Sequence, residues 1–364
     1  MNRPKHGGNL AWAAALAGCS PGAIVDFSAS ISPLGPPESV LAAIVAHLQD
    51  TRAYPDPDYS ELRAMLAVAH HLPSDWILPG NGSAELLTWA ARELSELEAA
   101  YLVTPAFGDY FRALLAFKAK VLKWPLGNGS LVIGNRAEFS QLPITNSQLP
   151  IPNSRSGLLL NNPHNPTGQL FSRETILPLL EQFALVVVDE AFMDFVLPHQ
   201  QQSLIPLVQE YPNLVILRSL TKFYSLPGLR LGYAIAHPNR LLKWQQWRDP
   251  WPVNVLAAAA AIAALQDKAF EQLSWDWLSA ARPRLFQGLA ELPGLCPFPG
   301  AANFLLVKSE QSSVLIQEKL LKQSRILIRD CLSFPELGDR FFRVAVRSQA
   351  DNQCLIEGLA QILH

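Results

Sequence analysis

The segment SLTKFYSLPGLRLG, residues 219–232, is the most specific pattern in the chain. It follows an apolar run typical of a buried strand, so Lys222 is expected just beyond a strand end. A lysine amine that is partly desolvated and near other cations loses its proton more readily and becomes a nucleophile toward an aldehyde. Ser219, Thr221 and Arg230 add hydroxyl donors and a guanidinium, which suit a phosphate group. The segment therefore predicts a site for an aldehyde cofactor with a phosphate tail, and the alternative is a lysine on a solvated loop.

Apolar runs of the same kind recur along the chain, separated by helix-compatible sequence. They comprise residues 100–103, 157–160, 185–188, 214–217 and 231–234. Continuous apolar runs predict strands that are buried on both faces, and their alternation with helices predicts an α/β fold with a largely parallel or mixed sheet inside helices. Functional groups in such a sheet collect at the strand ends, which is where Lys222 is expected.

The pattern changes after residue 250, where an Ala-rich helix precedes strands predicted at 303–307 and 342–346. We therefore expect three parts: an N-terminal arm (1–36) that contributes to the smaller domain and to the substrate site, a large α/β/α domain (37–250) and a smaller α+β domain (251–364). Residues 127–156 contain an imperfect duplication, QLPITNS followed by QLPIPNS, and are rich in Pro, Asn and Ser. Two copies are too few for a solenoid, so this segment is predicted to be a variable surface loop.

Polar residues follow the other predicted strands. Asp189 comes directly after the run 185–188, where a low pKa would keep it ionised beside an aromatic ring nitrogen; a helix N-cap is the alternative role. Asn165 lies in NNPHNPTG, a rigid turn whose amides could donate to a phenolic oxygen. GNGSAE, residues 80–85, precedes an apolar helix and resembles a loop whose backbone N–H groups bind phosphate.

The composition favours a small-molecule ligand. The chain has 364 residues, 49% hydrophobic content, 29 basic and 31 acidic residues, and a formal charge of -2. This balance provides no basic excess for nucleic acid or an anionic membrane. The four cysteines, at positions 19, 296, 331 and 354, are far apart and show no CxxC spacing, which argues against a metal site or a disulfide framework and favours the reducing cytoplasm.

One segment near the start resembles an export signal. The apolar run Leu10–Ala17 precedes Gly18-Cys19, a pattern cleaved before a lipid-modified cysteine. The run is short and follows His6-Gly7-Gly8-Asn9, which favours a turn into a short helix, so we expect a cytoplasmic protein. The apolar tract 255–265 is too short to span a bilayer.

In combination, these motifs resemble those of the fold type I pyridoxal-phosphate enzymes, in the class I/II aminotransferase family. The resemblance extends over the whole chain and is most specific over residues 158–234. It implies the aspartate-aminotransferase fold and pyridoxal 5'-phosphate as cofactor, with Lys222 and Asp189 as catalytic residues. It also implies that Tyr54, in Arg52-Ala53-Tyr54-Pro55, contacts the phosphate of the neighbouring subunit, and hence a homodimer.

The resemblance assigns the cofactor contacts one by one. They are Lys222 for covalent attachment, Asp189 for the pyridine nitrogen, Asn165 for the ring oxygen, Phe107 for stacking on the ring, and Ser219, Thr221, Arg230 and the backbone of Ser83 and Ala84 for the phosphate. For Phe107 the alternative is an ordinary buried core position.

Two subgroups of this family compete, the histidinol-phosphate aminotransferases and the threonine-phosphate decarboxylases of cobalamin synthesis. The segments that resemble the decarboxylases lie at the two ends of the chain and are HGGN (6–9), DFSA (26–29), PLGPP (33–37), RDC (329–331) and FRVAVRS (342–348). Phe192 stands where aminotransferases of the group usually have a tyrosine, which also favours a decarboxylase.

The choice between the two reactions depends on which bond to Cα stands perpendicular to the cofactor ring. The resemblance to the decarboxylases implies that Arg329, Arg343 and Arg347, with His6 assisting, hold the phosphate of L-threonine O-3-phosphate and leave its carboxylate free to be expelled. The product would then be (R)-1-amino-2-propanol O-2-phosphate, with no keto acid consumed. The alternatives are solvated surface charge for the arginines and a turn position for His6.

The sequence departs from the decarboxylase pattern at Ser30 and Ser32, where relatives usually carry asparagines in the segment entering the substrate site. Ser32 remains a candidate substrate contact, but its shorter side chain leaves another phosphorylated amino acid, such as phosphoserine, open as substrate. An aminotransferase that uses 2-oxoglutarate also stays open. A cofactor-binding regulatory domain is disfavoured, because the chain has no basic helix-turn-helix extension.

Overall fold

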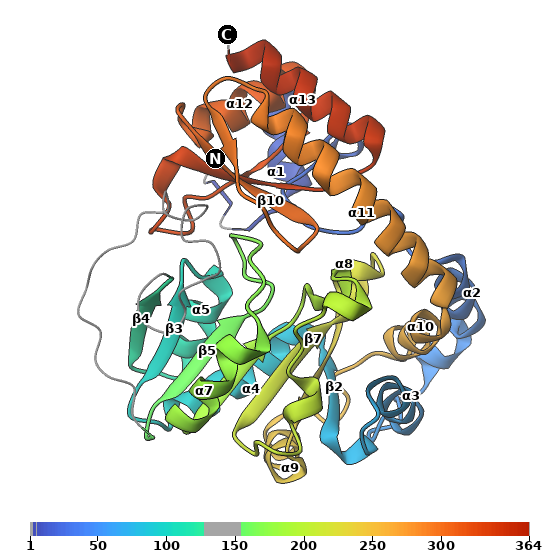
Figure 1. Cartoon of the computed structure of the whole chain (residues 1–364). Helices are drawn as coiled ribbons and strands as arrows, with labels where there is room; N and C mark the ends of the chain where they lie inside the picture. The colour runs from blue at the N-terminus through green and yellow to red at the C-terminus, as the bar shows by residue number, and fades with distance from the viewer. Residues whose placement is uncertain (1–2, 5, 127–153, 364) are drawn as a thin grey trace.

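The computed structural model describes residues 3–4, 6–126 and 154–363, and a seven-stranded sheet lies at the centre of its larger part (Figure 1). In spatial order its strands are β2 (Ile77–Asn81), β8 (Leu231–Ala236), β7 (Leu214–Ser219), β6 (Leu185–Asp189), β5 (Gly157–Asn161), β3 (Ala100–Thr104) and β4 (Val121–Pro125). Strand β8 is antiparallel to both its neighbours, and the other pairs are parallel. Each apolar run of the sequence analysis is a strand of this sheet, which confirms the predicted mixed, mostly parallel arrangement.

Side chains alternate in direction along each strand, so each strand contributes apolar side chains to both faces of the sheet. Helices cover both of these faces. In β6, Val186 and Val188 belong to one apolar cluster and Val187 belongs to another. Helices α4 (Gly82–Ser95), α5 (Gly108–Ala116) and α9 (Pro238–Trp247) contribute side chains to the cluster of Val187. Helices α7 (Arg173–Gln182), α10 (Val255–Gln266) and α11 (Lys268–Ala290) contribute to the opposite cluster.

A smaller antiparallel sheet forms the second part of the structure. Its strands, in spatial order, are β12 (Arg329–Asp330), β13 (Phe341–Ala345), β10 (Phe304–Ser309) and β9 (Leu295–Pro297). Helices α12 (Ser313–Ser324) and α13 (Gln349–Leu363) lie beside this sheet in Figure 1 and contact each other. The strands predicted at 303–307 and 342–346 are therefore confirmed, with bounds shifted by one or two residues.

The N-terminal segment lies against this smaller part. Strand β1 (Val25–Asp26) pairs in parallel with β11 (Ile326–Leu327), and α1 (Leu10–Ala17) packs on α12. Helix α1 is the short helix predicted there; the Asn9 side chain accepts a hydrogen bond from the backbone N–H of Trp12 at its start, and Gly18 ends it in the left-handed conformation.

Helix α11 runs from the neighbourhood of α10 to the smaller sheet (Figure 1). Helix α10 packs against α2 (Glu38–Ala46) and α3 (Ser60–His70), although it lies after residue 250. The division into three parts at residues 36 and 250 stays a prediction.

The predicted surface loop 127–156 lies largely outside the described residues, since only 154–156 are included. Within the described part of the chain, no helix is both long and apolar enough to cross a membrane. The four cysteines are all described and form no disulfide.

Candidate active site

A cavity of about 250 Å³ lies beyond the ends of β5 and β6 and beside α8 (Leu220–Phe223), the short helix that follows β7. Of the residues predicted for the site, it brings together His6, Ser83, Phe107, Asn165, Asp189, Lys222 and Arg343. The other lining residues are Gly7, Ser28, Ala29, Ser30, Ile31, Tyr110, Asn161, Ala191 and Phe192. The cavity thus collects side chains from strand ends of the large sheet, from the N-terminal segment and from the smaller sheet.

Lys222 is held at this cavity by the turn from β7 into α8. The Ser219 side chain accepts a hydrogen bond from the backbone N–H of Thr221 and so caps α8. The Nζ of Lys222 donates to Ser219 Oγ over 3.5 Å and lies 5.4 Å from the centre of the Phe192 ring. Burial lowers the pKa of Lys222; Asp189 opposes this shift, and Arg230 adds to it. An amine with a lowered pKa is more often in the neutral, nucleophilic form.

Asp189 lies at the end of β6 with both carboxylate oxygens engaged. Tyr110 donates its hydroxyl hydrogen to Oδ2 over 2.8 Å, and the backbone N–H of Ala191 donates to Oδ1 over 3.0 Å. Burial raises the pKa of Asp189, while Tyr110 and Lys222 oppose that shift. The low pKa expected from the sequence is therefore wrong for the chain on its own, because burial outweighs the two stabilising neighbours. A cation placed against Asp189 in the cavity would favour its ionised form.

The first turn of α4 and Arg230 lie side by side at a glycine-lined contact. Gly82 has a φ of +73°, and a Cβ at this position would lie 2.7 Å from Arg230 Nη2. A Cβ at Gly232 would lie 2.4 Å from the Ser83 nitrogen. Only glycine permits this close approach of strand, helix start and guanidinium. A helix N-terminus beside an arginine is suited to an anionic group such as phosphate.

Ser219 and Thr221 contribute hydroxyls near this contact. Their oxygens lie 2.7 Å apart, and both residues are buried. Ala84 follows Ser83 in the first turn of α4, as predicted, but does not line the cavity. The set of Lys222, Asp189, Arg230 and the α4 start fits an aromatic aldehyde with a ring nitrogen and a phosphate: a half-buried amine, a half-buried carboxyl group and a helix start beside an arginine are all present.

Arg343 projects from β13 into the cavity and links the two sheets. It is 8% exposed, its Nη1 donates to Asn165 Oδ1 over 2.5 Å, and its Nη2 donates to the Ser28 carbonyl oxygen over 3.4 Å. Its Nε is buried and has no hydrogen-bond partner within the described residues. Burial, together with the nearby charge of Arg329, lowers the pKa of Arg343 to about 10, so this guanidinium still carries a positive charge at neutral pH.

The other two predicted arginines are placed differently. Arg329 lies opposite Arg343 in the β12–β13 pair and donates to Ser333 Oγ over 2.6 Å. Arg347 donates to Asp351 Oδ2 over 3.1 Å and to the Asp26 carbonyl oxygen over 3.1 Å. Neither lines the cavity, so the structure brings only Arg343 of the three to its wall.

The N-terminal segment closes one side of the cavity. The His6 ring meets the Phe107 ring edge-on, with 5.6 Å between centres. Ser30 lines the cavity, and its Oγ is buried without a hydrogen-bond partner in the part of the chain that the structure describes. Ser32 does not line it: its backbone N–H donates to the Lys222 carbonyl oxygen, and its own carbonyl oxygen accepts from Ser225. Of the two serines that depart from the decarboxylase pattern, Ser30 is therefore the one at the cavity.

Tyr54 does not line the cavity and is exposed. It is 79% exposed and stacks on Trp251, with 4.3 Å between ring centres. It does not reach Lys222 of its own chain, and its role toward a neighbouring subunit stays a prediction.

Tyr110, the hydroxyl partner of Asp189, was not among the site residues predicted from the sequence. Tyr110 lies in the first turn of α5, three residues after Phe107, and the two rings meet edge-on at 5.7 Å. Residues three apart at a helix start lie on the same face, so the spacing between Phe107 and Tyr110 was the sequence feature that could have identified Tyr110 as a site residue.

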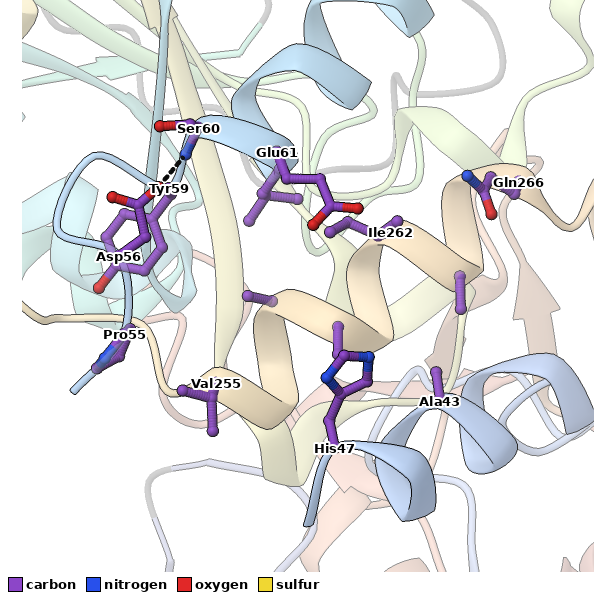
Figure 2. A pocket seen from close by; sticks show the side chains of 14 residues that line it. Ala43, His47, Pro55, Asp56, Tyr59, Ser60, Glu61, Val255, Ile262 and Gln266 are labelled. Atoms are coloured by element: carbon purple, nitrogen blue, oxygen red, sulfur yellow. Dashed lines mark hydrogen bonds between the residues drawn. The ribbon is translucent and has the colours of Figure 1, made fainter. Parts of the chain in front are cut away.

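A larger cavity, of about 400 Å³, lies between α2, α3 and α10 (Figure 2). Its polar lining includes His47, Asp56, Glu61 and Gln266, and no lysine or arginine is among the described residues that line it. It therefore does not suit an aldehyde with a phosphate group. Within the described residues, no group of three or more His, Cys, Asp and Glu is placed to hold a metal ion.

Comparison with known proteins gives consistent matches over most of the chain. The family described as aminotransferase class I and II matches residues 23–359. The chain is 40% identical to the threonine-phosphate decarboxylase of Salmonella typhimurium, over 98% of this chain and 96% of that protein. It is 30% identical to the adenosylcobalamin biosynthesis bifunctional protein CobDQ of Leptospira interrogans, over all of this chain but 42% of that protein.

Two solved structures resemble the chain to the same degree. The L-threonine-O-3-phosphate decarboxylase from Porphyromonas gingivalis has a TM-score of 0.81 at 25% identity, covering 93% of this chain and 99% of that one. The histidinol-phosphate aminotransferase from Clostridium acetobutylicum has a TM-score of 0.81 at 28% identity, covering 92% and 98%. The fold is therefore common to both activities, and similarity of backbone does not separate them.

Proposed function

This chain belongs to the aminotransferase class I and II family, and from that premise we propose that it decarboxylates L-threonine O-3-phosphate to (R)-1-amino-2-propanol O-2-phosphate. Pyridoxal 5'-phosphate is the cofactor of this family. The observation that carries the proposal is the 40% identity to a threonine-phosphate decarboxylase along almost the full length of both chains. The chain is also related to a bifunctional protein of adenosylcobalamin biosynthesis, which supports the proposal that the product is used in that biosynthesis.

The cofactor, when bound, supplies an electron-withdrawing ring that weakens the bonds to the α carbon of an attached amino acid. Lys222 would hold its aldehyde carbon and later return a proton to the α carbon, tasks that suit an amine whose pKa is lowered by burial. Asp189 would hold the ring nitrogen, and Asn165 the ring oxygen. Arg230, the start of α4 and the hydroxyls of the Ser219 segment would bind the phosphate of the cofactor.

The residues at the substrate end of the cavity are expected to determine which bond to the α carbon breaks. Arg343, His6 and Ser30 line its wall on the N-terminal side, and Arg343 offers a desolvated guanidinium to an anionic group. If the phosphate of the substrate binds beside Arg343, the carboxylate of the substrate is not held by Arg343 and can leave as carbon dioxide. A proton then takes its place at the α carbon. Phe192 offers no hydroxyl beside Lys222, in keeping with the decarboxylase subgroup.

The test offers L-threonine O-3-phosphate to the purified chain loaded with pyridoxal phosphate. We expect carbon dioxide and a phosphorylated amino alcohol without 2-oxoglutarate. Strict dependence on the keto acid, with glutamate as the second product, would refute the proposal in favour of an aminotransferase. The variant Lys222→Ala is the control for catalysis by this site, and turnover that survives in it would contradict the assignment of Lys222.

A histidinol-phosphate or related aminotransferase is the second candidate, supported by the match to the Clostridium acetobutylicum structure. The same assay separates the two, because transamination consumes one keto acid for each amine converted. Phosphoserine should be assayed beside phosphothreonine, because Ser30 lines the cavity where the resemblance to the decarboxylases implies a longer asparagine.

We also propose a cytoplasmic homodimer in which Tyr54 reaches the cofactor phosphate of the neighbouring subunit. The support is that Tyr54 is 79% exposed and that the apolar side chains of Leu41, Val45 and Leu48, on and just after α2, are exposed as well. The four reduced cysteines are compatible with the cytoplasm. Light scattering should give twice the chain mass, and Tyr54→Phe should weaken cofactor binding without changing that mass.

A further inference from the structure

A buried ion network lies on the face of the large sheet opposite Asp189 and Ser219. Its centre is Arg218, which is 3% exposed, and its main partner is Glu190, which is fully buried. Arg218 Nε donates to Glu190 Oε2 over 3.0 Å, Nη2 donates to Ser203 Oγ over 3.2 Å, and Nη1 donates to Asp194. Each of the three guanidinium nitrogens therefore donates a hydrogen bond.

Glu190 is held by more than the arginine. Its Oε2 also accepts the Ser203 hydroxyl over 2.7 Å, and its Oε1 accepts the backbone N–H of Leu204 over 2.8 Å. Its own backbone N–H donates to the Leu217 carbonyl oxygen over 2.8 Å, continuing the pairing of β6 with β7. The carboxylate is thus fixed in one orientation by the side chains and the backbone around it.

The position of this network in the sequence connects it with the cavity. Glu190 directly follows Asp189, and Arg218 directly precedes Ser219, the cap of the helix that carries Lys222. Successive side chains of a strand point to opposite faces. The side chains of Glu190 and Arg218 therefore lie on one face of the sheet, and the side chains of their neighbours Asp189 and Ser219 lie on the other.

We propose that Arg218 is a positioning residue, which sets the placement of Asp189 relative to Lys222 by tying the end of β6 to the end of β7 through Glu190. It does not line the cavity and so acts only through its neighbours in the chain. A buried ion pair is often no better for stability than an apolar pair of the same volume. The role of the Arg218 network is instead to fix positions. Its three directional hydrogen bonds, to Glu190, Asp194 and Ser203, hold the adjoining strand ends in place, whereas an apolar contact would allow the strand ends to shift.

The inference rests on Lys222 and Asp189 being the cofactor contacts of the proposed function. Its test uses no turnover, so failure of the decarboxylase assay does not affect it. The variant Arg218→Lys keeps the charge but cannot direct hydrogen bonds to three acceptors at once. The matched control is Arg240→Lys, because Arg240 also pairs with a glutamate, Glu93, but lies on α9 away from the cavity.

The full-length chain loaded with pyridoxal phosphate is titrated with acid and base, and the visible absorbance of the cofactor gives a midpoint pH. The cofactor dissociation constant and the melting temperature are measured on the same preparations. For Arg218→Lys we expect the midpoint to move by at least about half a pH unit and the dissociation constant to rise about tenfold, because small displacements of positioned groups have effects of this order. In Arg240→Lys both quantities should match the parent.

Ser203→Ala provides a second and milder variant, because it removes one hydroxyl that contacts both Glu190 and Arg218. It should change the midpoint and the dissociation constant in the same direction as Arg218→Lys, to a smaller extent, and it decides the matter if Arg218→Lys does not accumulate as folded protein. The inference is overturned if the folded variants melt at lower temperature but keep the parent midpoint and dissociation constant. That result would make the network a contribution to stability alone.

Discussion

Replacement of Gly232 by alanine should displace the helix start that is expected to bind the cofactor phosphate. A Cβ at this position would lie 2.4 Å from the Ser83 nitrogen and 2.7 Å from the Arg218 carbonyl oxygen, whereas ordinary contact begins at 3.4 Å. Both atoms belong to the backbone, so rotation of a side chain cannot relieve the contact. Either α4 or β8 must move by about 1 Å to restore ordinary van der Waals distances.

A displacement of about 1 Å in a positioned group can cost about 100-fold in function, which corresponds to about 2.7 kcal/mol. We therefore expect Gly232→Ala to bind pyridoxal phosphate about 100-fold more weakly than the parent chain, because the backbone N–H groups of the first α4 turn no longer align with Arg230. The assay titrates the cofactor-free chain with pyridoxal phosphate and follows tryptophan fluorescence, for which the sequence provides nine tryptophans.

The matched control is Gly228→Ala, in the connection that leads from β7 into β8. A Cβ at Gly228 would meet no atom within 4 Å, so its affinity for the cofactor should equal that of the parent. Circular dichroism and the melting temperature show whether each variant is folded. A folded Gly232→Ala chain with parent affinity would refute the reasoning, because it would mean that the α4 start tolerates the displacement or does not hold the phosphate.

Three further predictions concern other parts of the cavity and its surroundings. Tyr110→Phe removes a hydrogen bond to the half-buried carboxyl group of Asp189, of a kind worth about 1.5–3 kcal/mol, and should weaken cofactor binding about 10- to 150-fold in the same titration; an unchanged affinity would show that the hydroxyl is dispensable. Arg343→Ala should lower kcat/KM for the phosphorylated substrate at least about tenfold, because a charged hydrogen-bond donor at the cavity is lost, while Arg347→Ala should change it less than about twofold; equal losses would contradict their placement. Burial lowers the pKa of His164 to about 3, so the folded chain keeps this ring neutral while the unfolded chain protonates it near 6.5; the stability is present above pH 6.5 and is lost as the pH falls toward 3, so the melting temperature should drop over this range, with a smaller slope in His164→Asn.

The strands could be predicted from the sequence because they are buried on both faces. Runs such as 185–188 and 214–217 contain no polar residue, and the structure has strands at both. The direction of β8 could not be predicted in the same way, since an apolar run has the same composition whether it lies parallel or antiparallel to its neighbour. The packing of α10 on α2 and α3 was also beyond sequence reasoning, because an Ala-rich helix has no distinct polar face to show which side meets solvent.

For the site, sequence reasoning placed a polar residue at, or a few residues beyond, the end of each of two buried strands. Lys222 and Asp189 line one cavity for this reason. It failed where the property depends on tertiary packing: the pKa of Asp189 is raised, not lowered, because burial outweighs Tyr110 and Lys222. Ser30 and Ser32 could not be told apart either, because the turn that exposes one of them to the cavity is formed by contacts with residues far along the chain.

The contact between Arg343 and Asn165 has a consequence for measured affinities. Without a ligand, the guanidinium already spends one donor on the amide oxygen of Asn165, across the junction of the two sheets. An anion that binds Arg343 through this donor must exchange with that hydrogen bond instead of adding to it, so its dissociation constant reports a difference between two satisfied states. Replacement of Asn165 by a residue without an acceptor would then strengthen the binding of simple anions while removing the contact that we propose Asn165 makes to the cofactor. The same substitution would therefore have opposite signs in two binding experiments.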